Sequence, residues 1–128
     1  TQVAFFEDAL GEGRSSIIPP SARSLHELYR DLSDGSSYAS LLAAMLAAEW
    51  LYETWCAETL GRVSSRSHIR AWTSLHTDPA FTGHAAWLRS RLDALAPGLG
   101  EDESKAVASV FRDTLTAEIH FHDAVYER

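Results

Sequence analysis

Apolar residues along this chain recur at intervals of three and four positions, which is the spacing of one face of an α-helix. No stretch of useful length shows the apolar–polar alternation of a half-buried strand, and glycines and prolines fall between the periodic segments. The pattern therefore predicts an all-α fold, arranged as a helical bundle, with residues 1–128 forming a single domain.

The first half of the chain predicts two substantial helices. Residues 1–10 form a short helix or a helix end, and the sequence GEGRSSIIPPS after them is expected to be a loop. A helix should begin with Ser21 as its N-cap and stop near Gly35, with an apolar face formed by Leu25, Leu28, Tyr29 and Leu32. A long helix should then run from about Ser37 to Leu60, before the glycine that ends it.

Three further helices are expected in the second half. A short one covers residues 65–77. The next begins at Pro79, with a threonine or aspartate cap just before it, and ends near Pro97. The last covers residues 100–128 and has acidic residues in its first turn, which suits the helix dipole.

The long helix is apolar or small on every side from Tyr38 to Met45, so we expect protein to surround it. The other predicted helices are too few to cover it completely. The sequence also begins without Met and already in a helical pattern. We therefore expect that N-terminal helices of the fold are absent from this sequence, or that a second subunit covers the long helix.

Composition and charge exclude several classes of protein. The net charge is −7 and the 11 Lys and Arg residues are scattered, so no surface for nucleic acid or anionic membrane is expected. The longest apolar run is too short to span a bilayer. The single cysteine, Cys56, permits no internal disulfide and predicts a reducing, cytoplasmic compartment.

The apolar run MLAAEWLYETWC contains acids, and a carboxylate in a core costs several kcal/mol unless it is paired, protonated or hydrogen-bonded. Helical spacing puts four residues of this run in one stripe, namely Glu49, Tyr52, Glu53 and Cys56. Two interpretations stay open, because the stripe either emerges into water or lines a pocket. Trp50 and Trp55 flank the stripe on other faces, which favours a pocket.

The last predicted helix carries a second acid of this kind. Glu118 follows several residues on a mostly apolar side, and His122 lies one turn further on. Two carboxylates that project into one bundle indicate general acid–base catalysis or a metal site, unless Glu118 lies at the surface. In the sequence HIRAWTSLHTDPAF, the spacing of His68 and His76 favours structural histidines over catalytic ones.

Three stretches, SYASLLAAMLAAEWLYETW, IRAWTSLHTDPAFTGHAAWLRSRLDAL and FRDTLTAEIHFHDAVYER, resemble successive signatures of the TenA/thiaminase II family in order and spacing. The resemblance runs from about Ser21 to the C-terminus. It implies a heme-oxygenase-like α-helical fold, a homo-oligomer (commonly a tetramer) and an aminopyrimidine ligand. It also implies that an N-terminal portion of the fold is absent here, together with an acid and an aromatic residue that grip the pyrimidine.

Carried over residue by residue, the resemblance implies that one catalytic group is lost and another is kept. Ala48 stands where the family has its nucleophilic cysteine, and Tyr52 matches the tyrosine four residues later. Glu49, next to Ala48, resembles the carboxylate of a second branch of the family in which a glutamate replaces the thiol. Glu118 matches the near-universal catalytic glutamate of the last helix.

The activity that the resemblance implies is hydrolysis in thiamin salvage, with release of ammonia or a formamide-type nitrogen from an aminomethyl- or formylaminomethyl-pyrimidine. Glu118 and Glu49 are the expected catalytic residues, and water attacks directly. The expected substrate-binding residues are Tyr52, His76, Trp50, Phe81 and His122. No cofactor and no metal are expected, and Cys56, roughly 10 Å along the helix from Glu49, is not expected to be a nucleophile.

Two alternatives remain open at the level of sequence. In a metal-dependent oxidase of the di-iron type, Glu118 and His122 could chelate one ion, with Glu49 or Glu53 as a further ligand, but no second such pair is present in the sequence. In a degenerate or split family member, the bundle would bind a ligand or a partner chain without catalysis. A role in transcription finds no support, because a basic recognition helix is lacking.

Overall fold

The computed structural model describes residues 19–59, 62 and 65–126. These residues form helices and short connections without a strand, so the predicted all-α fold is confirmed. The α-helices are α2 (Pro20–Ser33), α3 (Tyr38–Thr59), α4 (Ser67–Thr77), α5 (Pro79–Leu95) and α6 (Glu101–Asp123), and two short 3₁₀ turns are η1 (Ala96–Gly98) and η2 (Ala124–Tyr126). The helix predicted at residues 1–10 lies outside the described residues.

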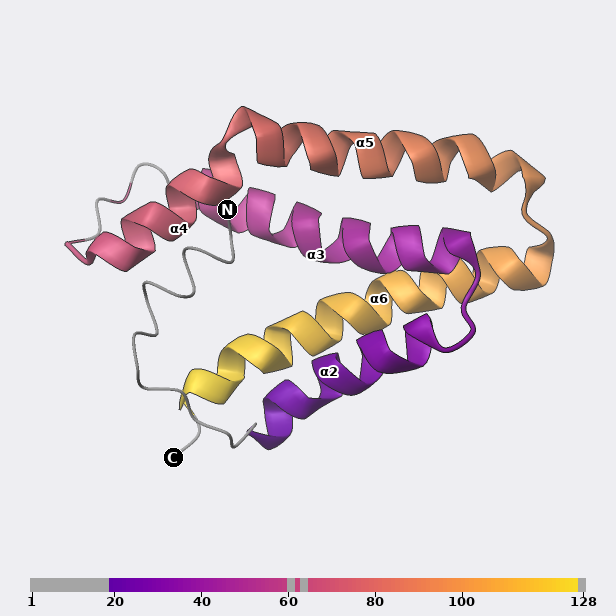
Figure 1. Ribbon diagram of the computed structural model, residues 1–128, viewed down its shortest axis with the longest axis horizontal. Helices are drawn as coiled ribbons and strands as arrows, with labels where there is room; N and C mark the ends of the chain where they lie inside the picture. Colours follow the sequence, from indigo (N-terminus) through magenta and orange to yellow (C-terminus); the bar gives the residue numbers. More distant parts are fainter. Residues whose placement is uncertain (1–18, 60–61, 63–64, 127–128) are drawn as a thin grey trace.

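Helix α3 is the central element of the bundle (Figure 1). It contacts α6, α5 and α4, while α2 packs mainly against α6. Helices α3 and α6 run in the same direction, and α2 and α5 run against them. Because α4 contacts the C-terminal part of α3, this end of the bundle gathers residues from α2, α3, α4 and α6.

The helix starts follow the sequence signals in one case and depart from them in another. The carboxylate of Asp78 accepts a hydrogen bond of 2.8 Å from the backbone N–H of Ala80, so the predicted cap before Pro79 is confirmed. The predicted cap at Ser21 is wrong, because α2 already begins at Pro20 and makes no side-chain cap hydrogen bond. Proline suits the first helical position through its fixed φ and missing N–H, which leaves Ser21 inside the first turn.

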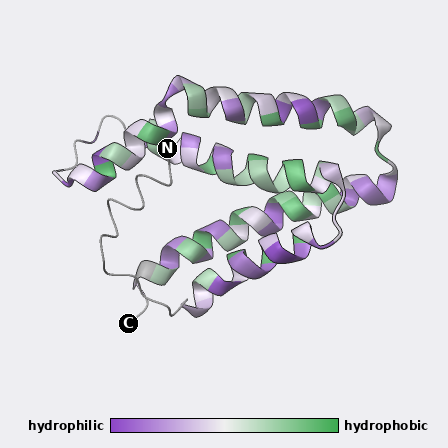
Figure 2. Ribbon diagram, viewed as in Figure 1, coloured by the Kyte–Doolittle hydropathy of each residue, from purple (hydrophilic) through white to green (hydrophobic). Residues whose placement is uncertain are grey.

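The apolar core lies between α3, α5 and α6. Leu42 and Leu46 of α3 are buried against Leu88 of α5, which is fully buried, and Phe111 of α6 packs against the same cluster. Each such leucine contributes about 1.5–3 kcal/mol through burial of its apolar surface. In Figure 2 hydrophobic residues follow α3 where it lies beside α6, whereas α2 carries many hydrophilic residues.

The expected enclosure of α3 on every side is correct for only part of its surface. Ala43 and Ala44 are 0% and 1% exposed, but Tyr38, Leu41 and Met45 are 53%, 36% and 43% exposed. These three residues share one face of α3, and the described helices leave that face partly open. None of the helices that the structure describes is both long and apolar enough to cross a membrane.

Candidate active site

Glu118 of α6 is the buried acid around which the candidate site is built. The residue is 3% exposed, and each of its carboxylate oxygens accepts a hydrogen bond from a tyrosine on another helix. Tyr52 of α3 donates to Oε2 at 2.8 Å, and Tyr29 of α2 donates to Oε1 at 3.5 Å. Donors of this kind are what allows a carboxylate to remain in a bundle interior, since an unpaired one would be costly.

The two tyrosines are held in their protonated, donating form. Burial first, and then the charge of Glu118, raise the pKa of Tyr52 well above its ordinary range. The same two causes raise the pKa of Tyr29. Tyr29 is a site residue that the sequence analysis did not identify, although it was expected on the apolar face of its helix. The available signal was that a tyrosine on such a face needs a partner for its hydroxyl.

His122 reaches the same cluster through Tyr52. Its Nε2 lies 3.2 Å from the Tyr52 hydroxyl oxygen, and its ring packs edge-on against Trp55 at a centroid distance of 5.2 Å. The Tyr52 hydroxyl therefore sits between Glu118 and His122, the pair that was considered as a metal chelate. Nowhere in residues 19–59, 62 and 65–126 do three or more His, Cys, Asp or Glu side chains gather as metal ligands.

His76 and Phe81 form an aromatic wall beside Tyr52. His76 is fully buried, and its ring centroid lies 5.1 Å from that of Tyr52 and 4.6 Å from that of Phe81. Burial lowers the pKa of His76, which favours the neutral ring, and its Nδ1–H donates to the backbone carbonyl of Trp72 at 2.8 Å. The structure thus brings together five predicted site residues, namely Glu118, Tyr52, His122, His76 and Phe81.

Glu49 lies on the neighbouring part of α3 and faces α5. Its Oε1 is 3.8 Å from Nδ1 of His84, and its Oε2 is buried without a hydrogen-bond partner in the described part of the chain. Burial raises the pKa of Glu49, His84 opposes this, and Glu118 adds to it. An open pocket of about 310 Å³ adjoins the pair, lined by Glu49, Leu75, Asp78, Ala80, Phe81 and His84.

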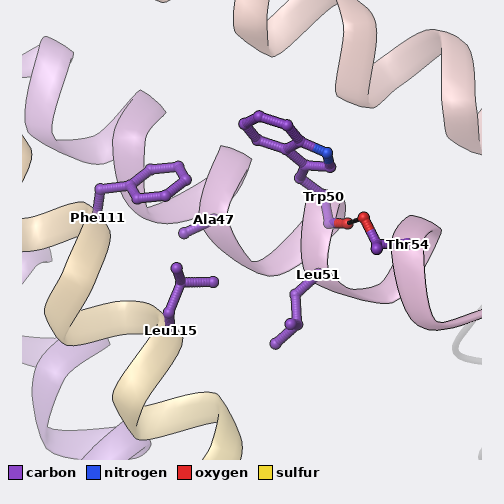
Figure 3. Close-up of a pocket in the computed structure, with 6 residues that line it drawn as sticks. All are labelled: Ala47, Trp50, Leu51, Thr54, Phe111 and Leu115. Carbon is purple, nitrogen blue, oxygen red and sulfur yellow. Dashed lines mark hydrogen bonds between the residues drawn. The ribbon is translucent and has the colours of Figure 1, made fainter.

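Trp50 is not brought together with Glu118. It faces an apolar groove between α3 and α6 of about 280 Å³, lined by Ala47, Trp50, Leu51, Thr54, Phe111 and Leu115 (Figure 3). The Trp50 ring meets Phe111 edge-on at 6.3 Å, and the Arg89 guanidinium lies 4.1 Å from the Trp50 ring centroid. This groove is on the side of α3 opposite Tyr52, because the two residues are two positions apart in the helix.

The sequence profile of the TENA/THI-4/PQQC family matches residues 14–128. The chain belongs to the TENA/THI-4/PQQC family. No curated protein and no solved structure shows significant similarity to it. Membership in this family confirms the resemblance found in the sequence and the type of helical bundle that it implied. Members of the TENA/THI-4/PQQC family are generally enzymes.

Three further residues that the sequence singled out, Cys56, Glu53 and His68, lie on α3 and α4. Cys56 is buried on α3, and burial raises the pKa of its thiol, which disfavours the reactive thiolate. Glu53 is half-buried, and His68 is exposed near the start of α4. His84 is a second residue that the sequence analysis missed, since a lone histidine on a helix gives no signal until the fold pairs it with Glu49.

Proposed function

We propose that this TENA/THI-4/PQQC family member hydrolyses an aminomethyl- or formylaminomethyl-pyrimidine and releases ammonia or a formamide-type nitrogen. The observation that supports this most is the buried Glu118, whose two oxygens accept hydrogen bonds from Tyr52 and Tyr29. A carboxylate fixed in this way, with a second carboxyl nearby, is suited to general acid–base chemistry at a bound heterocycle.

The two carboxyl groups have different roles in this proposal. Glu49 takes a proton from the attacking water, because its Oε2 has no partner among the described residues and its raised pKa makes it a better base. Glu118, held by two hydroxyls, orients the substrate through its exocyclic amine. A C–O bond forms from water, the C–N bond breaks, and the proton that Glu49 took from water passes to the leaving nitrogen.

The aromatic residues around Tyr52 would hold the pyrimidine. His76 and Phe81 offer a flat wall, and Tyr52 offers a hydroxyl to the ring or to the leaving group. His122 would act through Tyr52, whose hydroxyl it contacts. Trp50 was expected as a further wall, and its groove on the other side of α3 leaves it outside the proposed reaction.

The decisive experiment is the substitution Glu118→Gln, which keeps the size of the side chain and removes its charge. We expect kcat/KM for nitrogen release to fall by about 10- to 150-fold, because the exocyclic amine loses a charged hydrogen-bond partner and such a bond contributes about 1.5–3 kcal/mol. Cys56→Ala is the matched control and should retain activity, since its thiol has no role in the proposed reaction. Full activity of Glu118→Gln on every pyrimidine tested would refute the assignment.

We also propose that residues 1–128 act as one domain within a homo-oligomer, by family resemblance a tetramer, in the cytoplasm. The partly open face of α3 with Tyr38, Leu41 and Met45 supports association, because a contiguous apolar face is usually covered. Size-exclusion chromatography with light scattering tests the oligomer. A monomer at micromolar concentration would contradict it.

A further inference from the structure

The pocket between α3 and the start of α5 contains a titratable pair that the proposed reaction does not explain by itself. Glu49 Oε1 and His84 Nδ1 are 3.8 Å apart, close enough for an ion pair. Among the six residues that line this pocket, His84 is the one that can carry a positive charge. The other polar residue on the lining, Asp78, is engaged as the cap of α5 through Ala80.

His84 is both fixed and open to water. Its ring stacks on that of Trp87, one turn further along α5, at a centroid distance of 6.0 Å and an interplanar angle of 13°. The side chain of His84 is 43% exposed, whereas that of Glu49 is 23% exposed. The imidazole is therefore accessible to bulk solvent while it stays within reach of a largely buried carboxyl.

Other charged and titratable groups face Glu49 from the surrounding helices. Glu118 on α6 repels a negative charge on Glu49, and Tyr29 on α2 is coupled to Glu49 through space. Asp78 at the start of α5 lines the same pocket. Burial and the negative charge of Glu118 disfavour an ionised Glu49, and His84 opposes them.

We infer that His84 is a positioning residue that keeps Glu49 ionised and ready to take a proton from water. The inference rests on the proposed role of Glu49 as the base. When the imidazole is charged, its attraction stabilises the Glu49 carboxylate against burial and against Glu118. No covalent step is added, since His84 acts on Glu49 through charge alone and does not contact the substrate.

Two substitutions separate the charge of His84 from its bulk. His84→Gln removes the positive charge and keeps a polar side chain, whereas His84→Lys keeps a permanent positive charge at the same place. The matched control is His68→Gln, an exposed histidine near the start of α4. Because His84 is partly exposed, we expect all three variants to fold, which circular dichroism and thermal melting will verify.

Two measurements are made on the full chain. The first is the pH dependence of kcat/KM for nitrogen release. The second is independent of activity, and follows the side-chain carboxyl ¹³C resonance of Glu49 in ¹³C-glutamate-labelled protein, assigned by its loss in Glu49→Gln. In both, we expect the midpoint in His84→Gln to move to higher pH, and the midpoint in His84→Lys to remain at or below that of the unchanged protein.

The outcomes distinguish the inference from the proposed function. Equal midpoints in the unchanged protein, His84→Gln and His84→Lys would overturn the inference, even if hydrolysis is confirmed. A shifted Glu49 resonance in a protein without hydrolase activity would support the coupling of His84 to Glu49 and overturn its use in catalysis. A midpoint that moves equally in His68→Gln would also overturn the inference, because the effect would then reflect net charge alone.

Discussion

The first half of α3, residues 38–47, and its second half, residues 48–59, contact the rest of the bundle in different ways. The first half gives Leu42 and Leu46 to an apolar core with α5 and α6. The second half gives Tyr52 and Glu49 to polar contacts with Glu118 and His84. One continuous helix thus carries both the packing that stabilises the bundle and the groups that we propose for chemistry.

The two halves of α3 differ in which substitutions their contacts tolerate. Apolar packing in the first half depends on volume and burial, and several side chains can satisfy it. The second half lies beside a carboxylate that is 3% exposed, and this is stable only while particular donors remain in place. Substitutions in the first half should therefore change stability, and those in the second half should change activity out of proportion to stability.

The largest effect on stability is expected for Leu46→Ala in the first half. Leu46 is 4% exposed and packs in the core with Leu88, so its truncation should lower the free energy of unfolding by about 2–5 kcal/mol. Urea unfolding measures this loss. The comparison is Leu41→Ala on the open face of the same half, where Leu41 is 36% exposed within one chain. Its loss should be clearly smaller at protein concentrations that favour the monomer, and a loss that grows with concentration would support the proposed oligomer.

The next largest effect is expected for Tyr52→Phe in the second half. The variant loses the 2.8 Å hydrogen bond to Glu118, and a bond to a charged acceptor contributes about 1.5–3 kcal/mol. Activity should fall further than this loss implies, because Tyr52 also contacts His122 and the proposed ligand space. Steady-state kinetics and urea unfolding of the same preparation give both quantities.

Tyr29→Phe is the matched comparison for Tyr52→Phe. Its bond to the other oxygen of Glu118 is 3.5 Å long, so its loss should cost less in both stability and activity. If the two variants behaved identically, Tyr52 would have no function beyond holding Glu118.

The sequence predicted the fold more completely than the site, and α2 illustrates why. Its apolar period of three and four placed the helix correctly, because that period depends only on the helix itself. The exact start was wrong, since Ser21 and Pro20 both fit helix N-termini and only the backbone decides between them. A boundary error of two residues does not alter which face of α2 meets α6.

Site residues were predicted where their own helix or the family resemblance gave a signal, and missed where only the packing of helices gives them a partner. Tyr52 and Glu49 share a stripe on α3, and Glu118 stood out as an acid on an apolar side. Tyr29 and His84 become partners only through the way α2 and α5 pack, which local spacing does not encode. Trp50 was grouped with the site by proximity in sequence, although the helix turns it towards a separate groove.

The smallest effect is expected for Glu49→Gln, and it concerns how the free energy of unfolding changes with pH. The pKa of Glu49 is raised in the folded protein, so the folded state binds more protons than the unfolded state between the ordinary and the raised value. The contribution of Glu49 to stability therefore falls as pH rises through this window. Glu49→Gln lacks this contribution, and its free energy of unfolding relative to the unchanged protein should increase with pH there.

Glu53→Gln, which replaces a half-buried acid on the same helix, is the matched control for this pH dependence of the free energy of unfolding. Urea unfolding at several pH values between 4 and 8 compares the three proteins. A relative stability of Glu49→Gln that decreased with pH would mean that Glu49 is stabilised as a carboxylate in the folded protein. The surroundings of Glu49 in the second half of α3 would then satisfy its charge, and Glu49 would be a poor base. A relative stability that rises with pH would instead identify Glu49 as a group whose ionisation the fold opposes, which is the property that a general base in a bundle interior requires.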